Sequence, residues 1–401
     1  MRSSFRRIPE QFFGQRVQGI DLLRGLCIIA VVLHHINLRI RFNQSSTGQF
    51  IGRAANNVLF WNGYYGVRIF FVISGFLITG WSLRRWGCLH DLELKSFYRM
   101  RFARIVPSLL GLLLILSLCD LNRIPLFVIK HTTLPRALVA ALTFHVNWLE
   151  ASTGYLPAGW DVLWSLSVEE AFYVAFPLLC RWLRGRFLLI CVLLSFVVIG
   201  PFARILTRNP LWSDYGYLSC MDGVAIGCLA AMLAGTVQFS PRVNLAFRFG
   251  GSAMCLLIAV FRAAAAWIGF YKIGLDVTIL QIGTALLVIA MQQSGQAQSD
   301  RARLVSRLLK VQFPGRLLRW FGRNSYEVYL THMLVVLPVV AFIQHSHTSV
   351  NTAPVWFLAT VALSGLAGAA AAKYYSEPLN RRLRAGLRAG QPRSAMGAAA
   401  E

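Results

Sequence analysis

One apolar stretch of the chain, RGLCIIAVVLHHINLRI (residues 24–40), contains an arginine and two adjacent histidines. In a helix, at about 100° per residue, Arg24 and His35 lie within about 20° of one face, whereas His34 points about 80° away from it. A guanidinium binds anions and an imidazole accepts protons, so this face suits anion binding at Arg24 and general base catalysis at His35. The structural alternative is that Arg24 extends to the membrane surface and His35 caps the helix.

A second polar group lies in LWSLSVEEAFYVAFPLL (residues 163–179). Ser165 and Glu169 share a helical face, and Ser167 and Glu170 are adjacent to it. We expect Glu169 at the same membrane depth as His35, where a carboxylate next to the histidine would orient the imidazole and stabilise its protonated form. The alternative is a pair of interfacial carboxylates that line a water-filled vestibule.

A third group is the basic motif FYRMRFARIVP (residues 97–107), in which Arg101 and Arg104 are one helical turn apart. Paired guanidinium groups bind phosphates in a bidentate manner and would suit a nucleotide-containing thioester. Taken alone, the motif favours a topology anchor that binds lipid headgroups.

His332 in RNSYEVYLTHML and Glu377 in YYSEPLNRR are further candidates that could also be structural hydrogen-bonding partners.

The elements that position these residues are membrane-spanning helices. The chain has 401 residues, of which 56% are hydrophobic and 14% charged, and its mean hydropathy is +0.55. These values and the recurring long apolar runs predict an all-α, polytopic helical bundle. We expect ten spans, at about 19–39, 58–81, 104–119, 162–182, 187–206, 217–235, 249–268, 275–292, 325–343 and 355–375.

The basic residues predict the topology. The net charge is +24, from 40 Lys plus Arg against 16 Asp plus Glu, and the basic residues cluster between apolar runs. This pattern is typical of the positive-inside rule and of contact with anionic membrane lipids, and it argues against nucleic-acid binding. We expect that the marginal segment 136–149 does not cross the membrane, because the basic clusters then all fall on one side, with both termini cytoplasmic.

The remaining sequence features argue against several kinds of site and several classes of protein function. The eight cysteines contain no C-x-x-C pair, so we expect neither a metal site nor a disulfide framework. Motifs for nucleotide-driven transport, dinucleotide redox chemistry and zinc-dependent hydrolysis are also missing. We expect a basic cytoplasmic N-terminus at 1–16, one transmembrane domain at 17–380, a basic, disordered cytoplasmic tail at 381–401, and no additional soluble domain.

Six motifs occur in an order that resembles the integral-membrane acyltransferase family 3. They are GIDLLRGLCIIAVVLHH, GVRIFFVISGFLITG, FYRMRFARIVP, LWSLSVEEAFY, SYEVYLTH and SEPLNRRL. The resemblance covers about residues 17–385, and the family includes O-acetyltransferases of bacterial surface glycans and of rhizobial signalling oligosaccharides.

The resemblance implies a role for each candidate residue. His35, rather than His34, corresponds to the catalytic histidine of the family's motif, together with Arg24. Arg101 and Arg104 correspond to the arginines that serve acyl-CoA binding, and Ser165 and Glu169 to a pair that supports the site. One position departs from the family pattern, because Arg68 stands where an aspartate is usual.

We therefore expect an inner-membrane O-acyltransferase, most simply an O-acetyltransferase, that uses cytoplasmic acyl-CoA and no metal. His35 would deprotonate the acceptor hydroxyl or relay the acyl group. The expected acceptor is a surface polysaccharide, a lipid-linked glycan or a signalling oligosaccharide, which reaches His35 from the periplasmic side. Two alternatives are a proton-coupled glycan transporter with a relay of Arg24, His35 and Glu169, and a catalytically silent membrane scaffold.

Overall fold

The computed structural model describes residues 16–183, 185–296 and 313–389, and these residues form helices without a β-strand. Helices satisfy their backbone hydrogen bonds internally, which the hydrocarbon core of a membrane requires. Within the described ranges, nine helical stretches are long and apolar enough to cross a membrane. They are Gln18–Asn37, Ser46–Trp86, Leu94–Leu121, Ala158–Trp182, Arg186–Leu206, Pro210–Thr236, Leu275–Ser294, Ser325–His345 and Val350–Ala385. The chain is a multi-pass membrane protein.

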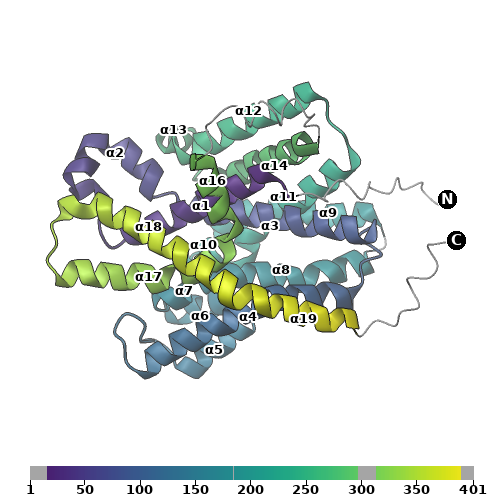
Figure 1. Cartoon of the computed structure of the whole chain (residues 1–401). Helices are drawn as coiled ribbons and strands as arrows, with labels where there is room; N and C mark the ends of the chain where they lie inside the picture. Colours follow the sequence, from purple (N-terminus) through teal and green to yellow (C-terminus); the bar gives the residue numbers. More distant parts are fainter. Residues whose placement is uncertain (1–15, 184, 297–312, 390–401) are drawn as a thin grey trace, which may run out of the picture.

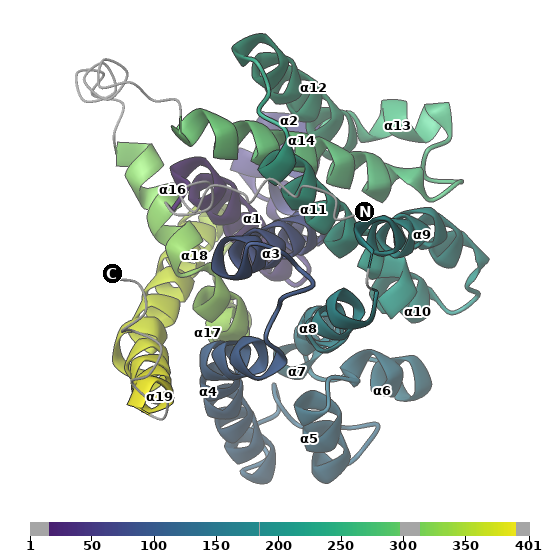
Figure 2. The same cartoon turned by 90° about the vertical axis from the view of Figure 1, so that its right-hand side faces the viewer.

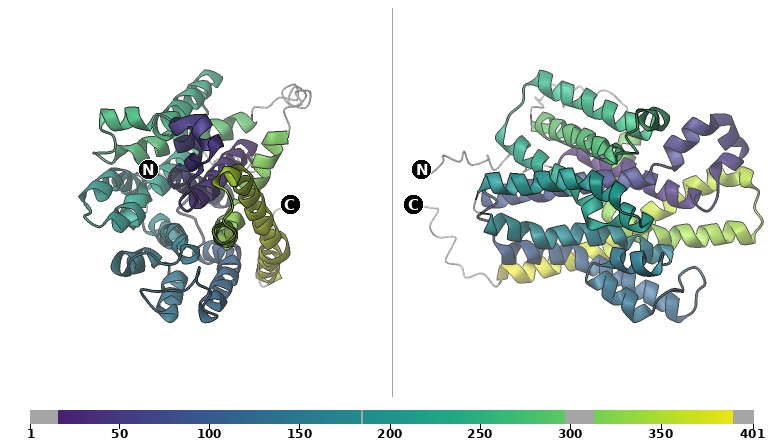
Figure 3. Two further views of the ribbon diagram at one scale, coloured as in Figure 1. Left: turned by 90° about the vertical axis from the view of Figure 1, so that its left-hand side faces the viewer. Right: turned by 180° about the vertical axis from the view of Figure 1, so that it is seen from behind.

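The long helices run roughly parallel, so the bundle has two ends (Figure 1). Helix α1 (Gln18–Asn37) starts toward the end of the bundle at which α19 (Glu377–Ala389) finishes. Helix α2 (Ser46–Phe60) and the connection from α17 (Ser325–His345) to α18 (Ala353–Ala370) lie at the opposite end, which the rear view in Figure 3 also shows. We call the end at which α1 starts and α19 finishes the arginine end, because seven arginines line a cavity there. The opposite end is called the α2 end.

One of the ten expected spans differs from its prediction. The stretch 249–268 is divided between α12 (Pro241–Ala259) and α13 (Arg262–Ile268), and it is not among the nine candidate spans. Helix α12 begins eight residues earlier than predicted, in the polar sequence PRVNLAFR, which lowers its mean hydropathy. It packs along α14 (Leu275–Gln296), as Figure 1 shows.

The marginal segment 136–149 does not form a spanning helix, as predicted. It contributes to two short helices, α5 (Leu134–Leu142) and α6 (Val146–Thr153), with Phe144 in the left-handed region between them at φ 57°. Each helix is about 12–14 Å long, less than half of the roughly 30 Å hydrocarbon core. Both lie at the edge of the bundle beside α4 (Leu94–Leu121) and α8 (Leu163–Trp182) (Figure 2).

At the chain ends, most of the expected terminal segments lie outside the described residues. This applies to residues 1–15 and 390–401. Residues 381–389 were expected to belong to a disordered tail, but they continue helix α19 as far as Ala389.

Helix α1 occupies a central position between α3 (Gly63–Trp86), α16 (Phe313–Arg323) and α17. It crosses α16 so closely that neither helix has room for a side chain at the crossing. A Cβ atom on Gly25 would lie 1.9 Å from the carbonyl oxygen of Leu318, and one on Gly322 would lie 1.7 Å from that of Asp21. This contact fixes the position of the neighbouring Arg24.

The other helices named here complete the fold. They are α7 (Ala158–Asp161), α9 (Arg186–Leu206), α10 (Pro210–Tyr215) and α11 (Tyr217–Thr236), with 3-10 turns at Phe42–Gln44 and Val350–Thr352 and a π-helical turn at Ala371–Ser376 before α19.

Candidate active site

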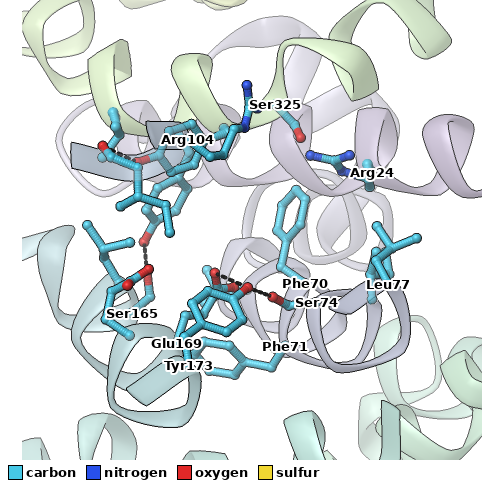
Figure 4. A pocket seen from close by; sticks show the side chains of 18 of the residues that line it. Arg24, Phe70, Phe71, Ser74, Leu77, Arg104, Ser165, Glu169, Tyr173 and Ser325 are labelled. Atoms are coloured by element: carbon cyan, nitrogen blue, oxygen red, sulfur yellow. Dashed lines mark hydrogen bonds between the residues drawn. The ribbon is translucent and has the colours of Figure 1, made fainter. Parts of the chain in front are cut away.

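A cavity of about 240 Å³ lies between α1, α3, α4, α8 and α17 (Figure 4). Five of the six candidate residues line it together: Arg24, Arg101, Arg104, Ser165 and Glu169. They come from three helices that are far apart in sequence, so the fold brings them into one site. His35 is not among the lining residues and lies further toward the α2 end of α1.

The three arginines differ in how they are held. The guanidinium of Arg104 forms an ion pair of 3.2 Å with Glu327, which is buried and also accepts a hydrogen bond from Ser376. The guanidinium carbon of Arg101 lies 4.0 Å from the centre of the Tyr173 ring, and its Nε is buried without a hydrogen-bond partner. Arg24 forms no hydrogen bond or close ion pair with another described residue, which leaves its charge available to a ligand.

Glu169 belongs to the arginine group rather than to the histidine. The hydroxyl of Tyr173 donates to its Oε2 at 3.4 Å and is also hydrogen-bonded to Ser74 (Figure 4). The expectation that Glu169 lies beside His35 is therefore wrong. Helix rise estimates depth along an axis but not the lateral placement of two helices, and the side chain of Glu169 points into the cavity. The proposed transporter relay loses its central contact for the same reason.

The ring that faces His35 is that of His332, on α17. The two ring centroids are 4.9 Å apart and the rings meet at 64°. Nδ1 of His35 donates to the carbonyl oxygen of Val31 at 2.8 Å. In the neutral imidazole this tautomer leaves Nε2 with a lone pair, which is the form that a general base needs.

His332 is held in the same tautomer. Its Nδ1 donates to the carbonyl oxygen of Tyr329 at 2.6 Å, and its Nε2 is buried without a hydrogen-bond partner. The histidine is completely buried. Two imidazole rings, each anchored through Nδ1, thus meet between α1 and α17.

Ser165 connects the cavity to this histidine pair through Tyr329. Its hydroxyl donates to the Tyr329 hydroxyl at 2.7 Å, and that hydroxyl donates to the carbonyl of Val162 at 3.0 Å. Tyr329 is one turn from His332 on α17. The sequence analysis did not select Tyr329, although it lies within the motif SYEVYLTH.

His34 faces away from the site, as the helical geometry predicted. Its Nδ1 donates to the carbonyl oxygen of Phe60 at 3.2 Å, and its ring packs against Trp61 at a centroid distance of 5.8 Å. A Cβ on Gly63 would lie 2.3 Å from the Cβ of His34, so α3 begins directly against this side chain. His34 therefore joins α1 to the α2–α3 connection.

A wider cavity of about 530 Å³ adjoins the first at the arginine end. The two cavities share Arg24, Leu77, Arg101 and Arg104. Seven arginines line the wider one, together with the carboxylates of Asp21 and Glu377: Arg16, Arg24, Arg84, Arg101, Arg104, Arg323 and Arg384. A surplus of guanidinium groups in one cavity suits a ligand with several phosphates.

Comparison with known proteins identifies the family. A family model described as an acyltransferase domain matches residues 17–373. The chain belongs to this acyltransferase family.

Two relatives illustrate the similarity. The O-acetyltransferase OatA of Staphylococcus aureus is 23% identical over 404 residues, which cover 94% of this chain and 59% of the relative. The peptidoglycan O-acetyltransferase OatA of Listeria monocytogenes is 25% identical over 340 residues, which cover 80% of this chain and 49% of the relative. The acyltransferase chain thus spans roughly half to three fifths of these relatives. No solved structure matches it.

Arg68, the departure from the family pattern, is fully buried and bound to polar groups of α10 and α11. It donates to the carbonyl oxygens of Ser219 at 2.9 Å and Asp214 at 2.7 Å, and to the Tyr64 hydroxyl at 2.5 Å. In this acyltransferase the position therefore joins α3 to its neighbours near the α2 end.

Two acidic residues near the site have structural partners. Glu377 forms an exposed ion pair of 3.2 Å with Arg381 at the rim of the wider cavity. Glu150, on the short helix α6, is completely buried and accepts a hydrogen bond from the backbone nitrogen of Leu156 at 3.1 Å. Burial and the nearby carboxyl of Asp161 raise the pKa of Glu150 well above its usual range.

The acyltransferase has no group of three or more His, Cys, Asp or Glu that could hold a metal among the residues described.

Proposed function

We propose that this chain is an inner-membrane O-acetyltransferase that moves an acetyl group from acyl-CoA to a hydroxyl group of a glycan. The observation that carries the proposal is an arginine-lined double cavity together with a pair of histidines in ring contact, His35 on α1 and His332 on α17. The family match and the names of the two relatives support the same reaction class. The proposed catalytic unit is the transmembrane domain at 17–380.

The arginine end would hold the donor. The wider cavity supplies guanidinium groups for the phosphates of coenzyme A, and Arg24, Arg101 and Arg104 line the passage to the narrower cavity. Arg24 and His35 are eleven residues apart, which is about 16 Å along the helix axis. An extended pantetheine arm covers a distance of this order, so the thioester would reach the histidine while the nucleotide stays among the arginines.

His35 would then act as the general base. Its Nε2 takes the proton of the acceptor hydroxyl, and the hydroxyl oxygen attacks the thioester carbonyl to form the new C–O bond. The C–S bond breaks, and the protonated His35 returns its proton to the leaving thiolate, so the histidine ends the cycle neutral. His332 would act as a positioning residue that fixes the orientation of the His35 ring.

The acceptor would approach from the α2 end, which we assign to the periplasmic side because the basic clusters favour cytoplasmic termini. Surface polysaccharides, lipid-linked glycans and signalling oligosaccharides all carry suitable hydroxyl groups. The basic clusters at the arginine end would contact anionic membrane lipids.

Purified protein in detergent provides the test. Acetyl-CoA with a labelled acetyl group is supplied together with glycan strands released from peptidoglycan, and the glycan is analysed by mass spectrometry for a labelled O-acetyl ester. We expect wild-type protein to form the ester and His35→Ala to form it at least about 100-fold more slowly. If wild-type protein forms no ester while it still binds acetyl-CoA, the proposed reaction is wrong. Mass spectrometry of surface glycans from cells with and without the gene identifies the natural acceptor.

A further inference from the structure

A third cavity, of about 200 Å³, lies at the α2 end between the last turn of α1 and helix α2. Its lining is rich in amide side chains: Asn37, Asn43, Gln49, Asn56 and Asn57. Trp61 and Arg53 complete the side-chain lining. Neither the family match nor the names of the relatives assign a role to this cavity.

The wall of the cavity is built by hydrogen bonds within α2. Gly52 interrupts the helix with a φ of 78°, and Nδ2 of Asn56 donates to the carbonyl oxygens of Gly48 at 2.6 Å and Gly52 at 2.7 Å. Asn56 is only 4% exposed, and its Oδ1 has no hydrogen-bond partner. Ser45 caps the start of the helix by accepting from the backbone nitrogen of Gly48 at 3.0 Å. The cavity is therefore a formed feature of α2 and not a gap beside a frayed helix.

The polar groups on its rim are available to a ligand. The side chains of Asn43, Gln49 and Asn57 are exposed and form no hydrogen bond with another described residue. Each amide offers both donors and an acceptor, which matches the hydroxyl groups of a sugar ring. An anionic ligand would pair with Arg53 and the amide donors but not with the amide acceptors, and an apolar ligand would pair with neither.

The position of the cavity links it to the candidate base. Asn37 ends α1 two residues after His35. The ring of His34 lies 5.7 Å from that of His35 and 5.8 Å from that of Trp61, so only one ring separates the cavity lining from the base. The guanidinium of Arg41 lies over the Trp61 ring, 4.9 Å from its centre, so one face of this tryptophan is already covered.

We infer that this cavity binds one sugar unit of the acceptor glycan, next to the unit whose hydroxyl is acetylated. The volume supports a single ring, because pockets for drug-sized ligands measure roughly 300–1,000 Å³. The inference rests on the proposed function, because the glycan is an acceptor only if the proposed reaction occurs. Binding of the glycan to the cavity can be measured without turnover.

The first experiment compares Gln49→Ala/Asn57→Ala with Gln44→Ala. Gln44 is a matched control, since it is an exposed amide in the same segment that does not line the cavity. With peptidoglycan glycan strands as acceptor, we expect the double variant to raise the acceptor KM about tenfold, because two hydrogen bonds are lost. The kcat and the KM for acetyl-CoA should not change. Gln44→Ala should behave as wild type.

The second experiment measures binding of the same labelled glycan strands to wild type and to both variants by equilibrium dialysis, without acetyl-CoA. Wild type and Gln44→Ala should bind equally and the double variant about tenfold more weakly. If the protein binds the glycan in this pattern but forms no ester, the cavity remains a glycan-binding site and the proposed reaction is wrong. If the enzyme is active and all variants have the same acceptor KM and the same glycan binding, the cavity does not bind the glycan, but the proposed reaction stands. Absence of both activity and binding would reject both proposals.

Discussion

The imidazole ring of His35 on α1 lies 4.9 Å from that of His332 on α17, and each ring is anchored through Nδ1 to a backbone carbonyl. The two helices thus present a pair of histidines where the sequence analysis expected a histidine and a carboxylate. The carboxylate, Glu169, contacts Tyr173 in the arginine-lined cavity instead. This arrangement separates the arginine side chains of the cavity from the proposed base.

The first prediction concerns the two adjacent histidines. His35→Ala should lower kcat by at least about 100-fold, because a positioned general base contributes on the order of 10²–10⁴. His34→Ala should cost much less activity, since His34 packs against the α2–α3 connection. The measurement is the rate of ester formation by each purified variant, with folding checked by thermal unfolding. Equal losses of kcat in two folded variants would contradict the assignment of roles.

His332 should act through His35 rather than on the substrates. We expect His332→Gln to lower kcat about 10- to 100-fold and to change the pH profile of kcat, with both KM values unchanged. His345→Gln is a suitable control, because His345 is exposed at the end of the same helix. A variant that loses only thermal stability, with the wild-type pH profile, would show that His332 is merely structural.

Arg101 and Arg104 should respond differently to truncation. Arg101→Ala should raise the KM for acetyl-CoA about tenfold, because a charge-assisted hydrogen bond to a phosphate is lost. Arg104→Ala should raise it too, and should also destabilise the protein by about 1–3 kcal/mol, since it leaves the buried carboxylate of Glu327 unpaired. The exposed Arg99, which lines neither cavity, gives the control Arg99→Ala.

These differences are measured by steady-state kinetics and thermal unfolding of each variant. An unchanged KM for acetyl-CoA beside a raised KM for the acceptor would assign the two arginines to the acceptor instead.

The crossing of α1 and α16 gives a prediction about stability. Gly322→Ala should destabilise the protein by about 3 kcal/mol, because the new Cβ would meet the carbonyl oxygen of Asp21 at 1.7 Å and force the helices apart. Gly250→Ala in α12 is the matched control: its Cβ would meet nothing within 4 Å, and the change should be neutral or slightly stabilising. Melting temperatures in detergent provide the comparison. Equal melting temperatures would show that α16 does not pack against α1 as described.

Much of the fold could be predicted from hydropathy and loop charge. Nine of the ten expected spans coincide with apolar helical stretches, because a membrane span leaves a long local signal. The prediction of the tenth span, at 249–268, was wrong because α12 starts in a polar sequence and ends at Ala259. The failure of 136–149 to span was also predictable, since the segment is too short.

The site was only partly predictable. The motifs selected Arg24, Arg101 and Ser165 one by one, but the sequence analysis grouped Ser165 and Glu169 with His35, whereas the structure places them in one cavity with the arginines. The contact between His35 and His332 depends on how α1 packs against α17, and spacing along one helix carries no information about that. The same limit explains the wrong placement of Glu169.

The central claim is that donor and acceptor meet from opposite faces of the membrane. The decisive measurement uses sealed proteoliposomes in which the orientation of the protein has been determined by protease accessibility. Labelled acetyl-CoA is supplied only to the face at the arginine end, and glycan strands only to the face at the α2 end. We predict labelled ester on the glycan in this arrangement, and none when the two compartments are exchanged. Ester formation only when both substrates are at the arginine end would contradict the account.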